Sequence, residues 1–397
     1  MTEFAAQLHF DRGHISKIET GKRLPSVPFA RACDQVLGSS GVFAAMAAAI
    51  DSAVRTRPSW VRPAQLPAAQ RNFVGRHNHL RRLGELLRRD ARSVAVPVAV
   101  IDGAPGVGKS ALAVQWARRA VDGGLFRDGQ LYVDLRGHSD QPSPVEIIDD
   151  LLRALGVPSG RIPIEPEQKS AVVRSLLDGR DVLIVLDNAT NTRQVQSLLP
   201  GSPSCAVLIT SRLRLSGLTS TVGAVTLTLP ELTEPEAIRL LRSIIGAQRA
   251  DADRAAVATV ARRCGRLPLA LVLAAEHIAT RRHRSAAQLA VELKADRALL
   301  DLAAGDIGLR AAFDASYRML DSPTAQLFRF LGRHPGQAID ARIAAAIAHT
   351  TLDNARSLLD QLAATSLLQC HGEDSYHLHD LHRAYATELG TQMDAAS

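Results

Sequence analysis

The residues best suited to chemistry are those of Gly103-Ala-Pro-Gly-Val-Gly-Lys-Ser110. They match the pattern G-x-x-x-x-G-K-[ST], which binds nucleotide phosphates where it follows a strand and opens a helix. Glycines let backbone N–H groups converge on phosphate oxygens, and the helix N-terminus adds its dipole. Lys109 would neutralise the β- and γ-phosphates, and Ser110 would offer its hydroxyl to Mg²⁺. The predicted nucleotide-binding loop comprises Gly103, Gly106, Val107, Gly108, Lys109, Ser110 and Ala111.

Two apolar runs end in residues that fit the same chemistry. Val182-Leu-Ile-Val-Leu-Asp187 places a carboxylate where a strand would meet solvent, so we predict that Asp187 lies on the Mg²⁺ side of the phosphates. Val207-Leu-Ile-Thr-Ser-Arg212 ends in a cation suited to the γ-phosphate, the alternative being an ordinary surface arginine. The predicted catalytic set is Lys109, Asp187 and Arg212. Because Asn188 follows Asp187 and an amide cannot accept a proton from attacking water, we expect slow hydrolysis at most.

A second candidate site lies at the N-terminus. The pattern predicts two short helices, over residues 2–8 and 12–20, with Asp11 capping the second and Gly21 closing it. Ile15 and Ile18 would pack inward. Basic residues on the outer face would then contact DNA, and these are Arg12, His14, Lys17, Lys22 and Arg23. The alternative is an ordinary helical hairpin with solvated charges.

The positive charge of the chain gathers in the same part of the sequence. The formal net charge is +7, yet residues 1–50 carry five basic against four acidic residues, and residues 51–98 carry ten arginines against three acids. The rest of the chain is therefore close to neutral. This distribution fits contact with a polyanion, or else an arginine-rich linker and helix face in solvent.

Composition bounds the class of protein. At 397 residues with 46% hydrophobic residues, the chain can form two to four packed domains. The four cysteines, at 33, 205, 264 and 370, fit neither metal-ligand spacing nor a disulfide framework, so we expect buried thiols. Apolar runs stay shorter than the roughly 20 residues that cross a bilayer, and acidic residues interrupt the first thirty positions. We expect a soluble cytoplasmic protein.

The pattern of elements divides the chain. An alanine-rich helix is predicted over 43–53, and a linker follows because Pro58, Pro63 and Pro67 interrupt residues 55–70. From residue 71, helices alternate with continuous apolar runs at 94–101, 130–135, 182–186 and 206–210. Such runs are typical of parallel strands buried on both faces, which predicts an α/β domain.

Helical periodicity dominates after Pro230. It predicts helices over 234–245, 254–264, 268–281 and 286–300, and then over 310–320, 323–332, 338–348 and 353–364. A β-hairpin is predicted from 366–370 and 375–378, joined by 371–374. Helices followed by a two-stranded wing indicate a winged-helix fold.

The N-terminal stretch resembles a known DNA-binding family. Ala6-Gln-Leu8 and His14-Ile-Ser-Lys-Ile-Glu-Thr-Gly-Lys-Arg-Leu-Pro-Ser26 are similar to the λ-repressor-like (XRE) helix-turn-helix of bacterial regulators. The resemblance implies contact with DNA. The family also has a helix before the position of Thr2, which this sequence starts too late to contain. We therefore expect either a start upstream of Met1 or impaired DNA binding.

Residues 71–397 resemble the NB-ARC domain of the STAND class of signalling NTPases, with the motifs in the family's order. Asn72-Phe-Val-Gly-Arg76 resembles the segment around adenine and ribose, which implies nucleotide contacts for Val74 and Arg76. Cys264-Gly-Arg-Leu-Pro-Leu-Ala-Leu271 resembles the G-L-P-L-A-L motif, which implies that Pro268 lies against the nucleotide. His377-Leu-His-Asp-Leu381 resembles the M-H-D motif, which implies that His379 contacts the β-phosphate of ADP.

The two resemblances imply a multidomain architecture of α/β plus all-α parts. We expect a helix-turn-helix over 1–42, a helix and linker over 43–70, a P-loop domain over 71–229, a helical domain over 230–304 and a winged helix over 305–397. The implied function is an ATP/ADP-dependent switch, with Mg²⁺, that regulates transcription through DNA binding or self-association. An unknown signal or sensor protein is a further expected partner. The alternatives are a switch that acts through protein partners without binding DNA, and a plain ATPase. The alanine- and arginine-rich composition is typical of a high-GC bacterium such as an actinomycete.

Overall fold

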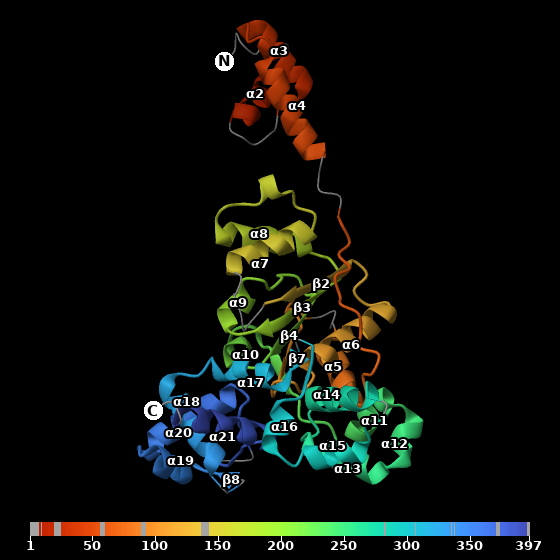
Figure 1. Cartoon of the computed structure of the whole chain (residues 1–397). Coiled ribbons are helices and arrows are strands. Elements are labelled where there is room, and N and C mark those ends of the chain that lie inside the picture. The colour runs from red at the N-terminus through yellow and green to blue at the C-terminus, as the bar shows by residue number, and fades with distance from the viewer. Residues whose placement is uncertain are drawn as a thin grey trace. The chain divides into compact units, whose positions relative to one another are not determined.

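The computed structural model describes two compact units, Met1–Val61 and Arg62–Ser397. The residues that it describes are 8, 10–19, 25–55, 60–88, 93–135, 143–281, 283–305, 307–334, 336, 338–370 and 374–394. Figure 1 labels their helices and strands, and each unit is described by itself.

The first unit contains three described helices, α2 (Arg12–Glu19), α3 (Val27–Leu37) and α4 (Val42–Arg55). Ser26 caps α3 by accepting the Phe29 N–H at 3.4 Å, as expected of a serine at an N-cap. Leu8, Ile15, Phe29 and Cys33 form a small buried core, and Ile18 packs against it. The prediction that Ile15 and Ile18 face inward is confirmed.

The predicted DNA-contacting groups lie outside what the structure describes. Lys22 and Arg23 fall in the undescribed residues 20–24. The backbone of α2 is described, but the side chains of Arg12, His14 and Lys17 are not. Most of the predicted first helix, over 2–8, is likewise outside the described residues, so these predictions stay predictions.

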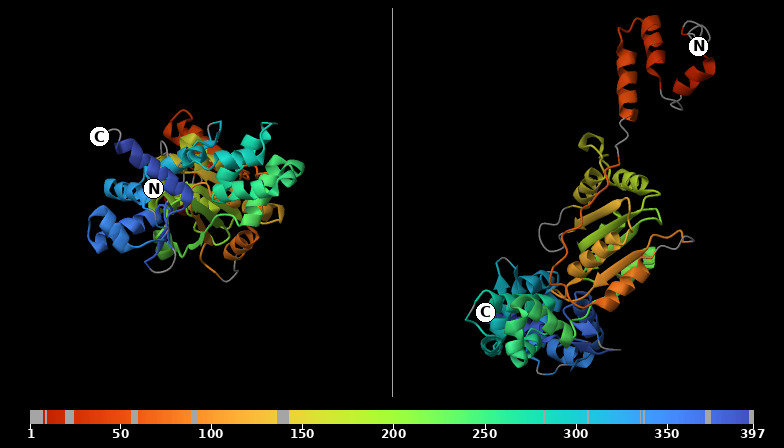
Figure 2. Two further views of the ribbon diagram at one scale, coloured as in Figure 1. Left: turned by 60° about the horizontal axis from the view of Figure 1, so that its bottom comes forward. Right: turned by 90° about the vertical axis from the view of Figure 1, so that its right-hand side faces the viewer.

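The second unit is built on a five-stranded parallel sheet in the order β2-β3-β4-β1-β5. The strands are β1 (Val98–Asp102), β2 (Gly129–Asp134), β3 (Val182–Ala189), β4 (Ala206–Ser211) and β5 (Val225–Thr228). The continuous apolar runs of β1, β3 and β4 are buried because helices cover both faces of the sheet, as Figure 2 shows.

Two sequence predictions about this sheet need correction. The strand predicted from residue 94 begins only at Val98, since Val94 is 90% exposed and Pro97 cannot donate to a ladder. The strand β5 was not predicted, because it has only four residues, and these lie at the sheet edge, are mostly exposed and form no continuous buried run.

Helices precede and follow the strands. They are α5 (His77–Leu86), α6 (Lys109–Asp122), α7 (Pro144–Ala154), α8 (Pro166–Leu177), α9 (Thr192–Gln196) and α10 (Ser216–Val222), with a 3₁₀ turn at Ser159–Arg161. The helix α6 starts at the end of the glycine loop that follows β1, so the predicted strand–loop–helix context is confirmed.

A helical segment follows the sheet. It comprises α11 (Glu234–Ile245), α12 (Ala247–Ala252), α13 (Arg254–Arg263), α14 (Pro268–Ala279), α15 (Ala286–Glu292) and α16 (Asp296–Leu300). The single helix predicted over 286–300 is wrong, because the chain turns after α15. The turn allows Leu293 and Leu299 to enter the same apolar core.

The C-terminal segment combines helices with a small sheet. The helices are α17 (Leu309–Tyr317), α18 (Ser322–Arg333), α19 (Ala341–Ala348), α20 (Leu352–Ala364) and α21 (Asp380–Asp394). The predicted hairpin is present as β9 (Gln369–Cys370) and β10 (Tyr376–His377), and β10 also pairs with β8 (Ala338–Ile339). The helix predicted from 338 therefore starts later, at Ala341. A separate two-stranded ribbon joins β6 (Ala303–Ala304) to β7 (Ile307–Gly308).

Two further expectations can be compared with the structure. Cys33, Cys205 and Cys264 are buried as expected, whereas Cys370 is exposed on the short edge strand β9, which corrects the prediction of four buried thiols. Of the helices that the structure describes, none combines the length and apolar character needed to cross a membrane.

Candidate functional site

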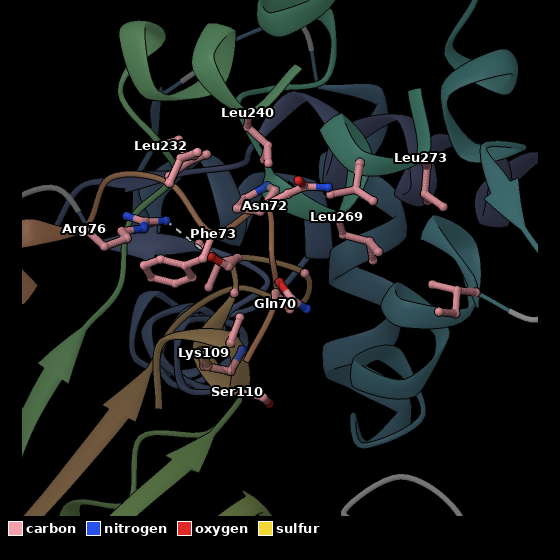
Figure 3. Close-up of a pocket in the computed structure, with 18 of the residues that line it drawn as sticks. Gln70, Asn72, Phe73, Arg76, Lys109, Ser110, Leu232, Leu240, Leu269 and Leu273 are labelled. Carbon is pink, nitrogen blue, oxygen red and sulfur yellow. Dashed lines mark hydrogen bonds between the residues drawn. The ribbon is translucent and has the colours of Figure 1, made fainter. Parts of the chain in front are cut away.

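A cavity of about 540 Å³ opens beside the glycine loop in the second unit. Five parts of the chain enclose it: the segment before α5, the loop and start of α6, the ends of β3 and β4, the helices α11 and α14, and the β6–β7 ribbon. Figure 3 shows Lys109 and Ser110 at the start of α6, with Leu269 and Leu273 of α14 on one side and Phe73 and Arg76 on the other. Of the predicted site residues, those that line the cavity are Val74, Arg76, Gly106, Val107, Gly108, Lys109, Ser110, Ala111, Arg212 and Pro268.

The loop itself is shaped by glycines packed against neighbouring segments. Gly106 has φ +78°, and a Cβ there would lie 2.9 Å from the Cβ of Leu269 in α14. Gly103 has φ +139°, and its Cβ would lie 2.6 Å from the carbonyl oxygen of Leu229. Gly103 therefore lies beneath the loop, against the chain that leaves β5, while the rest of the predicted loop faces the cavity.

Lys109 is buried at the base of the loop. Its Nζ donates to the carbonyl oxygens of Gly103 at 2.7 Å and Ala104 at 2.9 Å. Burial, together with the positive charge of Arg212, lowers the pKa of Lys109 to about 7, against the opposing effects of Asp187 and Asp102. The amine that the sequence predicts to contact phosphates is thus held where its protonated form is disfavoured.

Ser110 and Asp187 come together as the sequence predicts. The Ser110 hydroxyl donates to Asp187 Oδ1 at 2.8 Å, although the two residues are 77 positions apart. Tyr132 of β2 donates to Asp187 Oδ2 at 2.6 Å, and Thr210 of β4 donates to Oδ1. The strands on either side of β3 therefore orient the carboxylate toward the start of α6.

Arg76 closes one side of the cavity. Its side chain is only 5% exposed, and it donates to the carbonyl oxygens of Val107 and Glu231, each at 3.3 Å. Burial lowers the pKa of Arg76, against the raising effect of Glu236 and Glu231. The Arg76 backbone N–H also donates to Glu236 Oε1 at 2.9 Å, so the segment before α5 is tied to the first turn of α11.

Arg212 lines the cavity but has partners of its own. It donates from Nη1 to the carbonyl oxygen of Ala312 at 2.7 Å and to Ser316 Oγ at 3.3 Å, both in α17. Burial lowers the pKa of Arg212 to about 10. The predicted surface alternative is therefore wrong, because the guanidinium joins the end of β4 to the C-terminal segment.

Pro268 and His379, the two predicted site residues of the C-terminal half, both lie at the turn that leads into α14. Pro268 opens α14 beside Gly108. His379 is not among the cavity-lining residues; its Nε2 lies 3.1 Å from the carbonyl oxygen of Gly265, and its Nδ1 accepts the Leu381 N–H at 3.2 Å. Since Nδ1 accepts, Nε2 carries the proton and donates to Gly265. The histidine thus holds the turn that leads into Pro268.

Sequence reasoning did not identify the apolar wall. That wall consists of Phe73, Leu232, Leu240, Leu269, Val272 and Leu273, from three separate segments. Helical periodicity marks these leucines as buried, but nothing in the pattern distinguishes a residue that faces a cavity from one that faces the core.

Comparison with known proteins agrees with this geometry. Residues 80–202 match the AAA domain family. The chain is 40% identical over 337 residues to "Regulatory protein AfsR" of Streptomyces coelicolor, which covers 83% of this chain and 33% of that protein. It is 31% identical over 317 residues to Mb0914c of Mycobacterium bovis, provisionally named an HTH-type transcriptional regulator, covering 74% of this chain and 34% of the relative.

A solved structure shares the fold. The Walker-type ATPase PABY2304 of Pyrococcus abyssi superimposes with a TM-score of 0.57 at 14% identity, covering 82% of this chain and 98% of the other. The chain thus contains a AAA-type P-loop ATPase domain and is homologous to proteins named as regulators, of whose length it spans about a third.

Proposed function

We propose that the protein is an ATP- and ADP-dependent switch that regulates transcription. The cavity carries the proposal, because its wall combines the glycine loop with residues of the helical segment, Leu269 and Pro268 among them. A nucleotide in it would contact both parts at once. Its affinity would then differ between a closed and an open arrangement of these segments, which is what a ligand-driven switch requires.

Mg²⁺ fits the residues beside the loop. The hydroxyl of Ser110 and the carboxylate of Asp187 adjoin each other at 2.8 Å, and these are oxygen ligands of the kind that Mg²⁺ prefers. Among the residues that the structure describes, no cluster of three or more His, Cys, Asp or Glu could hold a metal ion. A magnesium ion held here would therefore rely on the phosphates for further ligands, and would neutralise their charge.

The remaining residues have separate tasks in the proposed switch. Lys109 and the backbone N–H groups of the loop bind the phosphates, and Val74 and Arg76 lie on the side proposed for adenine and ribose. Arg212 and His379 hold the closed arrangement, through α17 and through the turn at Gly265. Exchange of ADP for ATP would release the segment from residue 305 onward, proposed as a winged helix, and the opened form would self-associate.

The first experiment identifies the nucleotide that co-purifies with the full chain. The protein is denatured and the supernatant is separated by ion exchange, beside Lys109→Ala and the matched control Lys294→Ala, which removes an exposed lysine far along the chain. We expect ADP in the wild type and in Lys294→Ala, and none in Lys109→Ala. A site that is empty in all three, and that binds no added ADP, would contradict the proposal.

The second experiment tests the output. In this proposal the N-terminal unit is an XRE-like helix-turn-helix that binds DNA through Arg12, His14, Lys17, Lys22 and Arg23. DNA fragments from the protein's own genomic neighbourhood are titrated with protein loaded with ADP or with a non-hydrolysable ATP analogue. We expect affinities that differ at least tenfold. Equal DNA affinity in the two states would exclude the coupling, and no DNA binding in either state would favour a switch that acts on protein partners.

A further inference from the structure

Asn188 occupies an unusual position at the end of β3. Its backbone has φ +59°, in the left-handed region that asparagine tolerates better than most residues. Its N–H donates to Thr210 Oγ1 at 3.1 Å, and its side chain lines the cavity together with that of Ser110. The strained backbone thus holds a carboxamide at the edge of the nucleotide site.

Two carboxylates fix the orientation of this carboxamide. Asn188 Nδ2 lies 3.0 Å from Asp134 Oδ1 and 3.5 Å from Asp187 Oδ2. Asp134 and Asp187 are cross-strand partners at the ends of β2 and β3. Because ionised carboxylates only accept hydrogen bonds, the NH₂ group must face them and a flipped amide would set oxygen against oxygen.

The carbonyl oxygen of Asn188 is consequently turned away from both carboxylates. Within the described part of the chain, no hydrogen bond is donated to this Oδ1. The side chain is half-buried and cavity-lining, so the oxygen is an acceptor available to a molecule beside Ser110.

We propose that Asn188 positions the water that attacks the γ-phosphate, and that Asp134 is the positioning residue that holds the carboxamide in place. The inference rests on the proposed nucleotide site. It goes beyond the expectation of slow hydrolysis by assigning the amide a role in turnover and by adding Asp134, which the sequence did not single out.

The step balances without a protein base. One O–H of the water donates to Asn188 Oδ1, and the water oxygen forms a bond to the γ-phosphorus. The bond from that phosphorus to the β–γ bridging oxygen breaks, and ADP leaves with the electron pair. The water's other proton passes to a γ-phosphate oxygen, since the amide cannot accept it. Hydrolysis is slow because positioning is the only contribution of Asn188.

Two substitutions of Asp134 separate positioning from structure. Asp134→Asn retains an oxygen that accepts the Asn188 amide, whereas Asp134→Val removes the acceptor at similar size. We expect Asp134→Val and Asn188→Ala to lower the single-turnover rate of ATP hydrolysis roughly 10- to 100-fold, the scale of a misplaced reacting group. Asp134→Asn should stay within threefold of wild type. The Kd for ATP should change less than threefold in all of these variants.

A second readout does not depend on turnover. Because Asp134→Val hydrolyses slowly, its co-purified nucleotide should contain a larger fraction of ATP than that of the wild type or Asp134→Asn. If Asp134→Val fails to fold, as judged by circular dichroism, the single-turnover rates of Asn188→Ala and wild type still test whether Asn188 contributes to hydrolysis.

The outcomes distinguish this inference from the proposed function. If Asp134→Asn loses as much rate as Asp134→Val, the carboxylate itself is required and positioning through Asn188 is wrong. If Asn188→Ala hydrolyses ATP at the wild-type rate while still binding it, the inference fails and the switch survives. If wild-type protein binds no ATP or ADP, the proposed function itself fails.

Discussion

Lys109 combines burial with a position at the proposed phosphate site. Its ammonium group is surrounded by the carbonyl oxygens of its own loop, and burial brings its pKa to about 7. A polyphosphate placed against it would favour the charged form and raise the pKa again. Above about pH 7, where the unliganded amine is mostly neutral, we therefore expect nucleotide binding to take up a proton.

We predict that ADP binding at pH 8 takes up close to one proton and that the affinity falls as the pH rises from 7 to 9, up to about tenfold per pH unit. Isothermal titration calorimetry in two buffers of different ionisation enthalpy measures the uptake. The variant His79→Asn serves as a control, because burial also lowers the pKa of His79 and that side chain could contribute. Binding enthalpies that are equal in the two buffers would contradict the prediction.

The contact between His379 and Gly265 gives a second prediction at this scale. Gly265 has φ +57°, and a Cβ there would lie 2.2 Å from His379 Cε1. Gly223 has φ +66° with open space around its Cβ. We expect Gly265→Ala to lower the free energy of unfolding by about 2–4 kcal/mol and Gly223→Ala by about 1 kcal/mol, because only the first adds a steric clash to backbone strain.

Urea unfolding measures both glycine variants. In the His379→Ala background the excess cost of Gly265→Ala should shrink, since the ring that it meets is gone. If Gly265→Ala still lowers the free energy of unfolding by the same excess in that background, the added Cβ does not clash with the His379 ring.

At the residue scale, the sequence predicted groups that belong to one local motif. Lys109 and Ser110 are adjacent in the chain, and Asp187 ends a recognisable strand. It did not predict the bonds of Arg212 to α17, about 100 positions away, or the orientation of Asn188 by Asp134. Such contacts depend on strand order and on packing between segments, which a local pattern does not encode.

At the scale of elements, Glu236 joins two segments that enclose the cavity. It accepts the Thr233 N–H in the capping box of α11 and the Arg76 N–H from the segment before α5. Burial tends to raise the pKa of Glu236, but these hydrogen bonds prevail and lower it. The stabilisation is thus present above the ordinary carboxyl pKa of about 4.3 and is lost as the pH falls below it.

We predict that Glu236→Ala lowers the free energy of unfolding at pH 7 by about 1–3 kcal/mol and weakens ADP binding. The substitution removes both the capping hydrogen bond from the Thr233 N–H and the hydrogen bond from the Arg76 N–H. Glu234→Ala is the matched control on the same helix turn. Its ion pair with Arg262 is exposed, so the change should stay within about 0.5 kcal/mol. Urea unfolding and ADP titration compare the two, and the difference between them should fade near pH 3.

Elements were predictable where burial was uniform. The strands at 182–186 and 206–210 were identified because their apolar runs are continuous, and the strand at 130–135 was identified although the polar Gln130 and Asp134 stand in its run. The strands β5 and β8 were missed because they are short, and β5 is mostly exposed. The helix α21 was not predicted because its mixed pattern of Asp380 to Asp394 lacks a clear apolar stripe.

At the scale of the whole second unit, the chain after β4 is fastened to the C-terminal segment. Arg212 donates to Ala312, Ser366 Oγ donates to the Arg212 carbonyl oxygen at 2.7 Å, and the Arg214 N–H donates to the Ala364 carbonyl oxygen at 3.2 Å. These bonds connect Arg212, which lines the cavity, and the residues just after it to α17 and to residues 364–366.

We predict that Arg212→Ala increases amide hydrogen exchange in α17 by about tenfold or more, because its side chain donates to Ala312 and Ser316 of that helix. Residues 364–367 should change less, since they bond to the backbone around residue 212. Arg239→Ala, on an exposed face of α11, should leave these amides unchanged. Mass spectrometry of the exchanged protein measures both variants. Unchanged exchange in Arg212→Ala would mean that backbone bonds alone hold the contact.

The strand order has a practical consequence for anyone who dissects this protein. The stretch that matches the AAA family, 80–202, ends before β4 and β5, yet β1 pairs only with those two strands within the described sheet. A fragment cut at the borders of the match would hold β2 and β3 as one pair and leave the strand before the glycine loop without a neighbour. Ser110 and Asp187 would lose the framework that brings them together. A fragment that contains the whole sheet must therefore extend at least to the end of β5 at Thr228, beyond the stretch that the family comparison detects.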